Sequence, residues 1–362
     1  MMSYNPHRPY NELPPLPPRV EIETTQILRK TVSAGRALAE LKGLGGTIPD
    51  QSILINSLIL QEAKASSEIE NVHTTDTALF MAFSAKTGRV DPATKEVLRY
   101  REALWEGYED LERKQVLTTN LFVKAYQTIK ETRGGIRNTP GTRIINPTTG
   151  KVLYTPPEGD NLLRNKLSDL ERFIHGKDHF DPLINMALIH YQFEAIHPFP
   201  DGNGRVGRIL NILYLVHKGL LDFPVLYLSK YIIEKRTSYN RLLKRVTEQG
   251  EWEKWILYML DAVEQTASDT KERVVGIRDL LAETLDLAKE KLPSRVYSKD
   301  LIELLFHRPF TKVQFIVDAG IAKRQTASEY LKELEKTGIL KGYKSGKEKL
   351  YLNVRLYDLL TG

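Results

Sequence analysis

The sequence predicts an all-α fold that contains one β-hairpin and is followed by a separate C-terminal domain. Two stretches, Ile184–Ile196 and Arg205–His217, carry apolar residues at the density expected of buried helices. A hairpin is indicated at Arg143–Tyr154, where two short segments flank the turn sequence Pro147–Gly150. The excess positive charge lies entirely in residues 291–362, which predicts a C-terminal unit of different character.

The 362 residues are enough to bury a substantial core and to form two folded units. We expect an extended proline-rich arm at 1–20, N-terminal helices at 21–110, a helical core at 111–285 and the last domain at 291–362. The arm is expected to lie over the helical body or over a neighbouring subunit. Its segment Pro14–Arg19 also fits the pattern of an SH3-domain ligand, which is the less expected use.

The C-terminal unit has 14 Lys and Arg against 8 Asp and Glu. Glycines and helical spacing predict three short helices and then a hairpin. The predicted helices are Ser298–Phe306, Thr311–Ala319 and Lys323–Lys336, and the hairpin spans Ile339–Leu352 with its turn at Lys344–Lys347. This pattern resembles a winged helix-turn-helix domain.

The third of these helices should place Ala327, Leu331 and Leu334 inward. Its outward residues would be Lys323, Arg324, Gln325 and Ser328, and the wing would carry Lys341, Lys344, Lys347 and Lys349, with Glu348 as its only opposing charge. Such a surface suits DNA. Winged helices also dock proteins or form dimers, so DNA, a protein partner and a homodimer all stay open.

Several classes of protein are excluded or disfavoured. The chain has no cysteine, so it has neither disulfides nor a thiolate metal site, and no apolar run approaches the ~18–20 residues that cross a bilayer. The start of the chain does not resemble a signal peptide, and we expect a cytoplasmic protein without membrane partners. Neither a Gly-x-Ser-x-Gly elbow nor a Walker phosphate loop is present.

The most informative segment is His197–Arg208, between the two buried helices. Pro198 biases His197 away from helical dihedrals and so predicts an imidazole at a helix end. We expect Asp201–Gly204 to form the turn between the helices, because Gly202 and Gly204 can take positive φ and let backbone N–H groups point into one concavity. The following helix adds the positive end of its dipole. This turn is predicted to bind an anion.

The side chains of the segment suit phosphoryl or nucleotidyl transfer. A neutral imidazole at His197 can accept a proton from an attacking hydroxyl. Asp201 offers a hard oxygen ligand for Mg²⁺, which is commonly shared between one carboxylate and substrate phosphates. Arg205 and Arg208, three residues apart, can clamp phosphate oxygens.

This segment resembles the signature of the Fic family, His-x-Phe-x-(Asp/Glu)-Gly-Asn-Gly-Arg-x-x-Arg, at every specified position. The resemblance implies a Fic-type helical bundle. The hairpin fits a substrate-positioning flap whose exposed edge pairs with an extended target segment, and an ordinary surface hairpin stays open as the alternative. The resemblance also implies a nucleotidyltransferase that moves AMP from ATP to Ser, Thr or Tyr hydroxyls of target proteins and of itself. The nucleotide-binding residues that it implies are Glu70, His197, Gly202, Asn203, Gly204, Arg205, Val206, Gly207 and Arg208, with His197 as the base and Asp201 on Mg²⁺.

A second motif, Ser66–Asn71, lies at the end of an apolar helical run from Ile53 to Leu60. It resembles the (Ser/Thr)-x-x-x-Glu-(Gly/Asn) inhibitory motif of the same family, with Ser66 and Glu70 on one helical face. The resemblance implies that Glu70 pairs with Arg208 and so excludes competent nucleotide. Its position before the signature implies the class with an N-terminal inhibitory helix.

Three alternatives remain. Glu70-Asn-Val-His73 and Glu194-Ala-Ile-His197 have the Glu-x-x-His spacing of di-iron bundles, although this reading gives no reason for the glycines and arginines that follow. The same site could instead remove AMP, with Glu70 orienting a water. A DNA-binding regulator whose Fic half only senses ATP is the non-enzymatic alternative, but sensing needs no base at His197.

Overall fold

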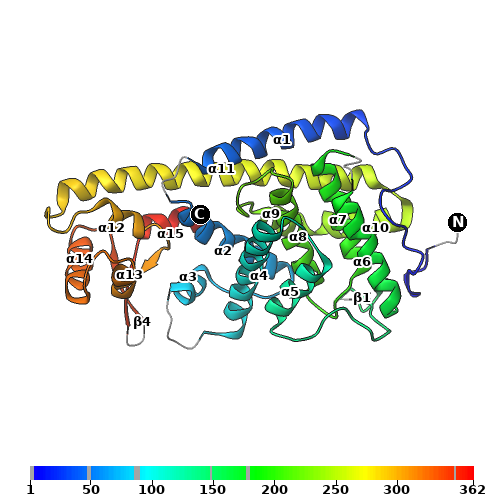
Figure 1. Cartoon of the computed structure of the whole chain (residues 1–362), viewed down its shortest axis with the longest axis horizontal. Helices are drawn as coiled ribbons and strands as arrows, with labels where there is room; N and C mark the ends of the chain where they lie inside the picture. The colour runs from blue at the N-terminus through cyan, green and yellow to red at the C-terminus, as the bar shows by residue number, and fades with distance from the viewer. Residues whose placement is uncertain (1–3, 47–49, 85–89, 147–148, 177–179, 346–347) are drawn as a thin grey trace.

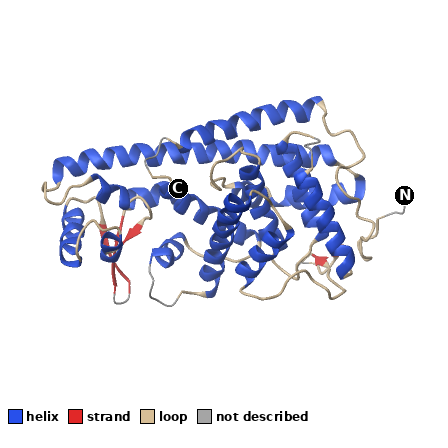
Figure 2. Ribbon diagram, in the orientation of Figure 1, coloured by secondary structure: helices blue, strands red, loops and turns tan. Residues whose placement is uncertain are grey.

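The computed structural model describes residues 4–46, 50–84, 90–146, 149–176, 180–345 and 348–362. In this part of the chain the fold is predominantly helical and has two small antiparallel sheets, which confirms the predicted fold class (Figure 2). Among these residues, none of the helices combines the length and the apolar character that crossing a lipid bilayer requires.

The N-terminal and central elements are α1 (Thr25–Gly45), α2 (Ser52–Ile69), α3 (Asp76–Ser84), α4 (Pro92–Lys114), α5 (Thr119–Lys130), β1 (Ile144–Ile145), β2 (Val152–Tyr154), α6 (Asp160–His175), α7 (Pro182–Ile196), α8 (Asn203–His217), α9 (Leu228–Glu234), α10 (Arg236–Gln249) and α11 (Trp252–Lys291). The C-terminal elements are α12 (Lys299–Leu304), β3 (Phe310–Thr311), α13 (Val313–Asp318), α14 (Arg324–Lys336), β4 (Lys341–Ser345), β5 (Glu348–Leu352) and α15 (Val354–Thr361).

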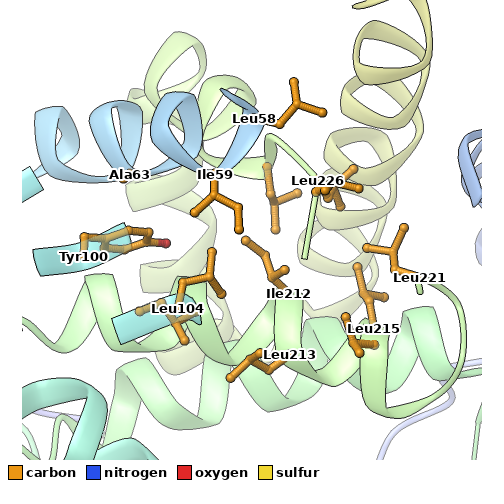
Figure 3. Close-up of a cluster of buried hydrophobic side chains, with 14 of the residues drawn as sticks. Leu58, Ile59, Ala63, Tyr100, Leu104, Ile212, Leu213, Leu215, Leu221 and Leu226 are labelled. Atoms are coloured by element: carbon orange, nitrogen blue, oxygen red, sulfur yellow. The ribbon is translucent and has the colours of Figure 1, made fainter. Parts of the chain in front are cut away.

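The helices α7 and α8 form the centre of the bundle. Both are apolar on nearly all faces, so they can be stable only where other helices enclose them. Figure 3 shows this enclosure for α8, where Ile212 and Leu213 face Ile59 of α2 and Leu104 of α4. The segment between α7 and α8 is therefore held between the ends of two buried helices.

The most extensive packing between two helices is that of α1 with α11, which run side by side along one edge of the molecule (Figure 1). The helix α11 continues past the bundle to the C-terminal unit and spans the boundary that we expected between 285 and 291. Within α11, Arg273 Nη1 donates a hydrogen bond to Leu360 O of α15 at 2.6 Å. This helix therefore connects the two parts of the chain.

The predicted hairpin is present: β1 and β2 pair antiparallel, with Ile145 opposite Val152. Pro147 and Thr148 of its turn lie outside the described residues. The proline-rich arm lies over this hairpin and the neighbouring helices of its own chain. The Tyr10 N–H donates to Thr155 O at 3.0 Å, and Pro14 O accepts from Gln192 of α7 at 2.9 Å. The arm is thus an integral part of the fold.

The C-terminal unit contains the three predicted helices and the hairpin of β4 and β5, with the positive-φ glycines Gly320 and Gly338 where expected. Two expectations are corrected. Thr311 belongs to strand β3, which pairs with β5, because its side chain is buried against the sheet instead of starting a helix. The segment Val354–Thr361 forms a further helix, whose N-cap is Asn353.

Candidate active site

The structure places His197 directly after the last residue of α7. Its backbone has φ 50° and ψ 59°, a left-handed conformation that is uncommon for a residue with a side chain. The neighbouring Arg137, which is 3% exposed, holds this conformation. Arg137 Nε donates to His197 O at 2.8 Å, and the Arg137 N–H donates to Pro198 O at 2.9 Å. No motif in the sequence points to Arg137.

The imidazole of His197 is held in its neutral form. Burial, and secondarily the positive charge of Arg137, lowers the pKa of His197 from 6.5 to about 4. Its Nδ1 atom is buried and has no hydrogen-bond partner in the structure. At physiological pH the ring therefore has an unprotonated nitrogen with which it can accept a proton.

The turn between the helices is shorter than we expected. Gly202 has φ 74°, but α8 already begins at Asn203, so Gly204 lies in the first helical turn and does not have positive φ. The cause is the amide of Asn203, which bridges the turn. Asn203 Oδ1 accepts from Phe199 N at 2.8 Å, and Asn203 Nδ2 donates to Phe199 O at 2.7 Å.

Gly204 is needed for a different reason. A Cβ atom at this position would collide with the carboxylate of Glu70 and would lie 2.9 Å from Arg208 Nη1. The first turn of α8 is therefore in direct contact with Glu70. Of the next residues, Val206 is buried and donates its N–H to Gly202 O at 3.1 Å, and Gly207 faces Glu194 of α7.

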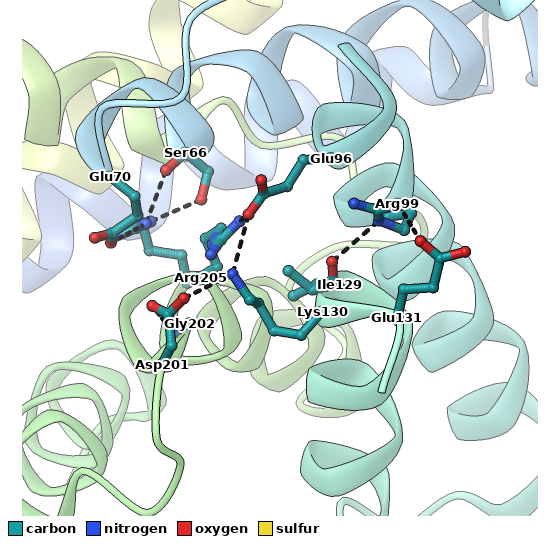
Figure 4. Close-up of polar contacts among 11 residues, drawn as sticks. Ser66, Glu70, Glu96, Arg99, Ile129, Lys130, Glu131, Asp201, Gly202 and Arg205 are labelled. Atoms are coloured by element: carbon teal, nitrogen blue, oxygen red, sulfur yellow. Dashed lines mark hydrogen bonds and ion pairs between the residues drawn. The ribbon is translucent and has the colours of Figure 1, made fainter. Parts of the chain in front are cut away.

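The predicted contact between Glu70 and Arg208 is present. Arg208 Nη2 lies 2.8 Å from Glu70 Oε1 and 2.8 Å from Ser66 O, and Arg208 Nε donates to Ser66 Oγ at 2.7 Å (Figure 4). Burial acts to raise the pKa of Glu70, but the charge and hydrogen bonds of Arg208 outweigh it and lower this pKa. Glu70 is therefore ionised and occupies the side of α8 that presents Arg208. The neighbouring Asn71 has φ 62° and turns the chain away from α2.

A second group of charges, which the sequence analysis did not find, surrounds Arg205. Arg205 Nη1 forms an ion pair with Glu96 Oε1 of α4, and Lys130 Nζ of α5 lies 3.4 Å from the same oxygen. Lys130 Nζ also lies 2.6 Å from Asp201 Oδ2. Glu96 and Lys130 are 109 and 71 residues from Arg205 and Asp201, so no local pattern in the sequence indicated these pairs.

The described residues suit a magnesium ion that shares its ligands with a phosphate. They do not form an enclosed metal site made of protein side chains. Among the described residues, groups of three or more His, Cys, Asp or Glu able to hold a metal do not occur. The Asp201 carboxylate is 65% exposed, and its Oδ1 accepts from Gly202 N at 2.6 Å. A single accessible carboxylate suits a cation whose other ligands are phosphate oxygens and water. The Glu70 carboxylate is engaged by Arg208, which does not support the di-iron alternative.

Comparisons with known proteins identify three regions of the chain. Residues 28–109 match the Fic/DOC family N-terminal domain, and residues 95–215 match the Fic/DOC family. Residues 280–356 match the C-terminal domain of SoFic-like protein adenylyltransferases. The first two matches include the motif around Glu70 and the whole His197–Arg208 segment.

Curated relatives are similar over part of their length. A probable protein adenylyltransferase of Aquifex aeolicus is 38% identical over 79 residues, which are 22% of this chain and 24% of that protein. The protein adenylyltransferase Fic of Drosophila melanogaster is 30% identical over 112 residues, which are 30% of this chain and 21% of that protein. The chain thus matches about a quarter of the length of these relatives.

Solved structures share the fold. A Fic family protein from Desulfovibrio desulfuricans superposes with a TM-score of 0.58 at 19% identity, covering 93% of this chain and 98% of that one. Fic-1 from C. elegans gives a TM-score of 0.51 at 18% identity, with 70% of this chain and 74% of that chain covered. The former likeness extends through nearly the whole chain, including the C-terminal unit.

One further acid lies close to this site. Glu194 is on the last turn of α7, and its Oε1 atom is buried without a hydrogen-bond partner. Burial raises the pKa of Glu194 to about 7; Arg208 opposes this shift, and the charge of Glu70 adds to it. In the unfolded chain the same carboxyl ionises near 4.5. Its contribution to stability is therefore present below pH 4.5 and is lost as the pH rises toward 7.

We predict that Glu194→Gln, which cannot ionise, raises the thermal unfolding midpoint at pH 8 relative to the parent protein. The difference between the two midpoints should be small near pH 4.5 and should grow up to about pH 7. Unfolding followed by circular dichroism across this range measures it. Parallel curves for the two proteins would show that Glu194 is not buried in its neutral form.

Proposed function

The chain carries Fic/DOC family domains and a SoFic-like C-terminal domain, and from this premise we propose that it is a protein adenylyltransferase. The observation that carries this proposal is the neutral His197 at the end of α7, six residues before an α8 N-terminus that bears two buried arginines. A base beside an anion-binding helix end is the arrangement needed to attack a phosphate with a hydroxyl.

In the proposed reaction the unprotonated nitrogen of His197 takes the proton of a Ser, Thr or Tyr hydroxyl on the target. The hydroxyl oxygen forms a bond to the α-phosphorus of ATP, the bond from this phosphorus to the bridging oxygen breaks, and pyrophosphate leaves. The first-turn N–H groups of α8, together with Arg205 and Arg208, would stabilise the charge that accumulates on the phosphates. The rate enhancement comes mainly from positioning and charge.

Asp201 is the residue that would hold Mg²⁺ in this site. When bound, the metal would neutralise phosphate charge and help pyrophosphate to leave. Asp201 is placed for this by the chain itself, because its backbone begins the tight turn at Gly202 and its carboxylate is exposed on the same side as the first turn of α8.

We further propose that Glu70 inhibits the protein. Its carboxylate contacts Arg208 and lies against Gly204. It therefore fills the space that the terminal phosphates of ATP would take and neutralises the arginine with which they would pair. Ser66 completes the contact by accepting from Arg208 through both its hydroxyl and its carbonyl. A nucleotide must displace this pair before it can bind productively.

The target segment is proposed to pair with the hairpin beside the site. The arm makes its contacts on the β2 side, where Tyr4 and Tyr10 pack around Tyr154. Ile145 of β1, in contrast, is 52% exposed. An extended target would therefore add along β1, with pairing of main-chain groups providing most of its affinity.

The first prediction concerns the base. His197→Ala should abolish transfer of label from α-labelled ATP to protein. Because the pKa of His197 is lowered to about 4, transfer by the parent protein should be constant from pH 8 to about 5 and fall only below that. Label incorporation measured across this range is the test. A decline centred near pH 6.5, as for an ordinary imidazole, would contradict the assigned environment.

The second prediction concerns inhibition. Glu70→Gly should increase self-labelling by about tenfold or more, because it frees Arg208 for phosphate. The matched control is Glu68→Gly, which makes the same change two residues earlier on a side chain that faces Lys64. Initial rates at one ATP concentration give the comparison. If both variants label at the parental rate, Glu70 does not restrain the site.

The C-terminal unit exposes basic residues of the kind that bind nucleic acid. Lys323, Arg324 and Gln325 are exposed at the start of α14, and Lys341 and Lys344 are exposed on β4. This surface is less positive at Lys349 than the sequence suggested, because Lys349 pairs with Glu335 at 2.7 Å. Glu348, the opposing charge of the wing, is itself paired with Lys312 at 3.3 Å, and Lys347 lies outside the described residues. We propose duplex DNA as its partner, bound by a winged helix-turn-helix.

The third prediction tests this partner. The parent protein should bind duplex DNA with an affinity that falls as salt increases, and Lys323→Ala with Arg324→Ala should weaken binding about tenfold. Lys332→Ala with Lys336→Ala, at the other end of α14, is the matched control. Fluorescence anisotropy in 50 to 200 mM salt is suitable. Undetectable or salt-insensitive binding would instead favour a protein partner or a second copy of this chain.

A further inference from the structure

A chain of four alternating charges lines one side of the proposed nucleotide site: Asp201, Lys130, Glu96 and Arg205. Lys130 Nζ lies 2.6 Å from Asp201 Oδ2 and 3.4 Å from Glu96 Oε1, and Glu96 Oε1 also contacts Arg205 Nη1 (Figure 4). Within this group the charges cancel. Two of its members, Asp201 and Arg205, belong to the signature, but Glu96 and Lys130 come from helices that precede it.

Lys130 lies over the anion-binding turn itself. A Cβ atom added at Gly202 would be 3.6 Å from Lys130 Cδ and 3.7 Å from Arg205 Nη2. The stem of Lys130 and the guanidinium of Arg205 therefore flank the same glycine. The two cations are presented together at the turn that precedes the first N–H groups of α8.

The position of Lys130 is fixed by the packing of α4 against α5. Lys130 is the last residue of α5, where carbonyl groups lack helical partners. Arg99, one turn after Glu96 on α4, holds this helix end: Arg99 Nε donates to Ile129 O at 3.2 Å, and Arg99 Nη1 lies 2.7 Å from Glu131 Oε2. Lys130 is thus preorganised by its neighbours and does not sample the surface freely.

The ion pairs of Lys130 also leave its ammonium group able to bind a phosphate. Its side chain is 26% exposed and the Asp201 carboxylate is 65% exposed, so both can be reached from solvent. An ammonium group has three N–H donors, and the two carboxylates engage two of them. If Asp201 binds a divalent cation, the ammonium loses this partner and gains a like charge nearby, and an adjacent phosphate oxygen becomes its best acceptor.

We propose that Lys130 binds the polyphosphate of the nucleotide and that Glu96 is the positioning residue that orients Lys130 and Arg205 toward it. This deepens the proposed function and rests on it, because it assumes that ATP is the ligand of the α8 N-terminus. It adds a third cation to the two arginines of the signature. Phosphate would replace, or share the arginine with, Glu70 at Arg208 and Glu96 at Arg205. At Lys130, phosphate would replace Asp201.

The test measures binding, with no need for catalysis. In the Glu70→Gly background, we expect Lys130→Gln to weaken ATP binding about tenfold and to leave adenosine binding unchanged, because adenosine has no phosphate. Lys130→Arg keeps the positive charge and should retain most of the affinity for ATP. Isothermal titration with and without Mg²⁺ gives the constants, and the loss should be larger with the metal, which draws Asp201 away from Lys130.

Lys124→Gln is the matched control. It removes another lysine of α5 that pairs with a glutamate of α4, Lys124 Nζ being 3.4 Å from Glu106 Oε2, but it lies away from the turn. This variant should bind ATP as the Glu70→Gly protein does. Equal ATP affinity in Lys130→Gln and Lys124→Gln would overturn the inference and leave the proposed function intact. Absence of ATP binding in the Glu70→Gly protein itself would overturn both.

A second measurement does not depend on how the Lys130 variant folds. In the Glu70→Gly protein, acetylation of individual lysines by an amine-reactive reagent can be followed by mass spectrometry. ATP should slow the modification of Lys130 several-fold while adenosine does not, and Lys124 should be unaffected by either. Modification of Lys130 at the same rate with ATP and with adenosine would contradict direct contact with phosphate.

Discussion

The structure depends on one constraint: two arginines at the start of α8 are almost completely buried and each must be paired. The side chains of Arg205 and Arg208 are 2% and 1% exposed. A buried charge without a partner costs several kcal/mol, so these positions are tenable only beside a carboxylate or a bound anion. Glu96 and Glu70 are those carboxylates. They come from α4 and from the C-cap of α2, which explains why the His197–Arg208 segment requires the helices that precede it.

The same constraint connects the Ser66–Asn71 motif with the rest of the protein. Helix α2 is anchored below Ser66 by Glu62, which accepts from Ser229 N at 2.9 Å and from Tyr100 at 3.1 Å. Burial outweighs these hydrogen bonds and raises the pKa of Glu62 to about 7. At its other end, Asp50 lies 2.9 Å from His307 of the C-terminal unit. The helix that presents Glu70 is therefore held from both sides.

Local features could be predicted from the sequence and distant pairings could not. The helix end at His197 followed from Pro198, and the contact of Glu70 with Arg208 followed from the resemblance of two motifs. Arg137, Glu96 and Lys130 were missed because ordinary helical and loop residues acquire their roles only when the helices pack. Strand β3 was missed for a related reason, since two residues become a strand only through pairing with β5.

The turn at Gly202 shows how one chemical expectation can be reached from two different geometries. We expected two glycines with positive φ, whereas only Gly202 has it and Gly204 makes room for a carboxylate. The side chain of Asn203 closes the turn through its two hydrogen bonds with Phe199. As a result, α8 begins at Asn203, before Gly204. An anion site results in either case, because both arrangements present a helix N-terminus.

Charge balance explains why composition alone gave little indication of this site. Residues 1–290 contain 38 Lys and Arg against 38 Asp and Glu, so the part of the chain with the signature has no net charge. Three of these cations, Arg205, Arg208 and Lys130, meet at the α8 N-terminus and are paired there with Glu96, Glu70 and Asp201. In the proposed function, attraction for a polyphosphate would thus arise from local exchange of partners and not from a positive overall field. Affinity for the proposed nucleotide would then be set by how firmly Glu70, Glu96 and Asp201 hold the cations they occupy.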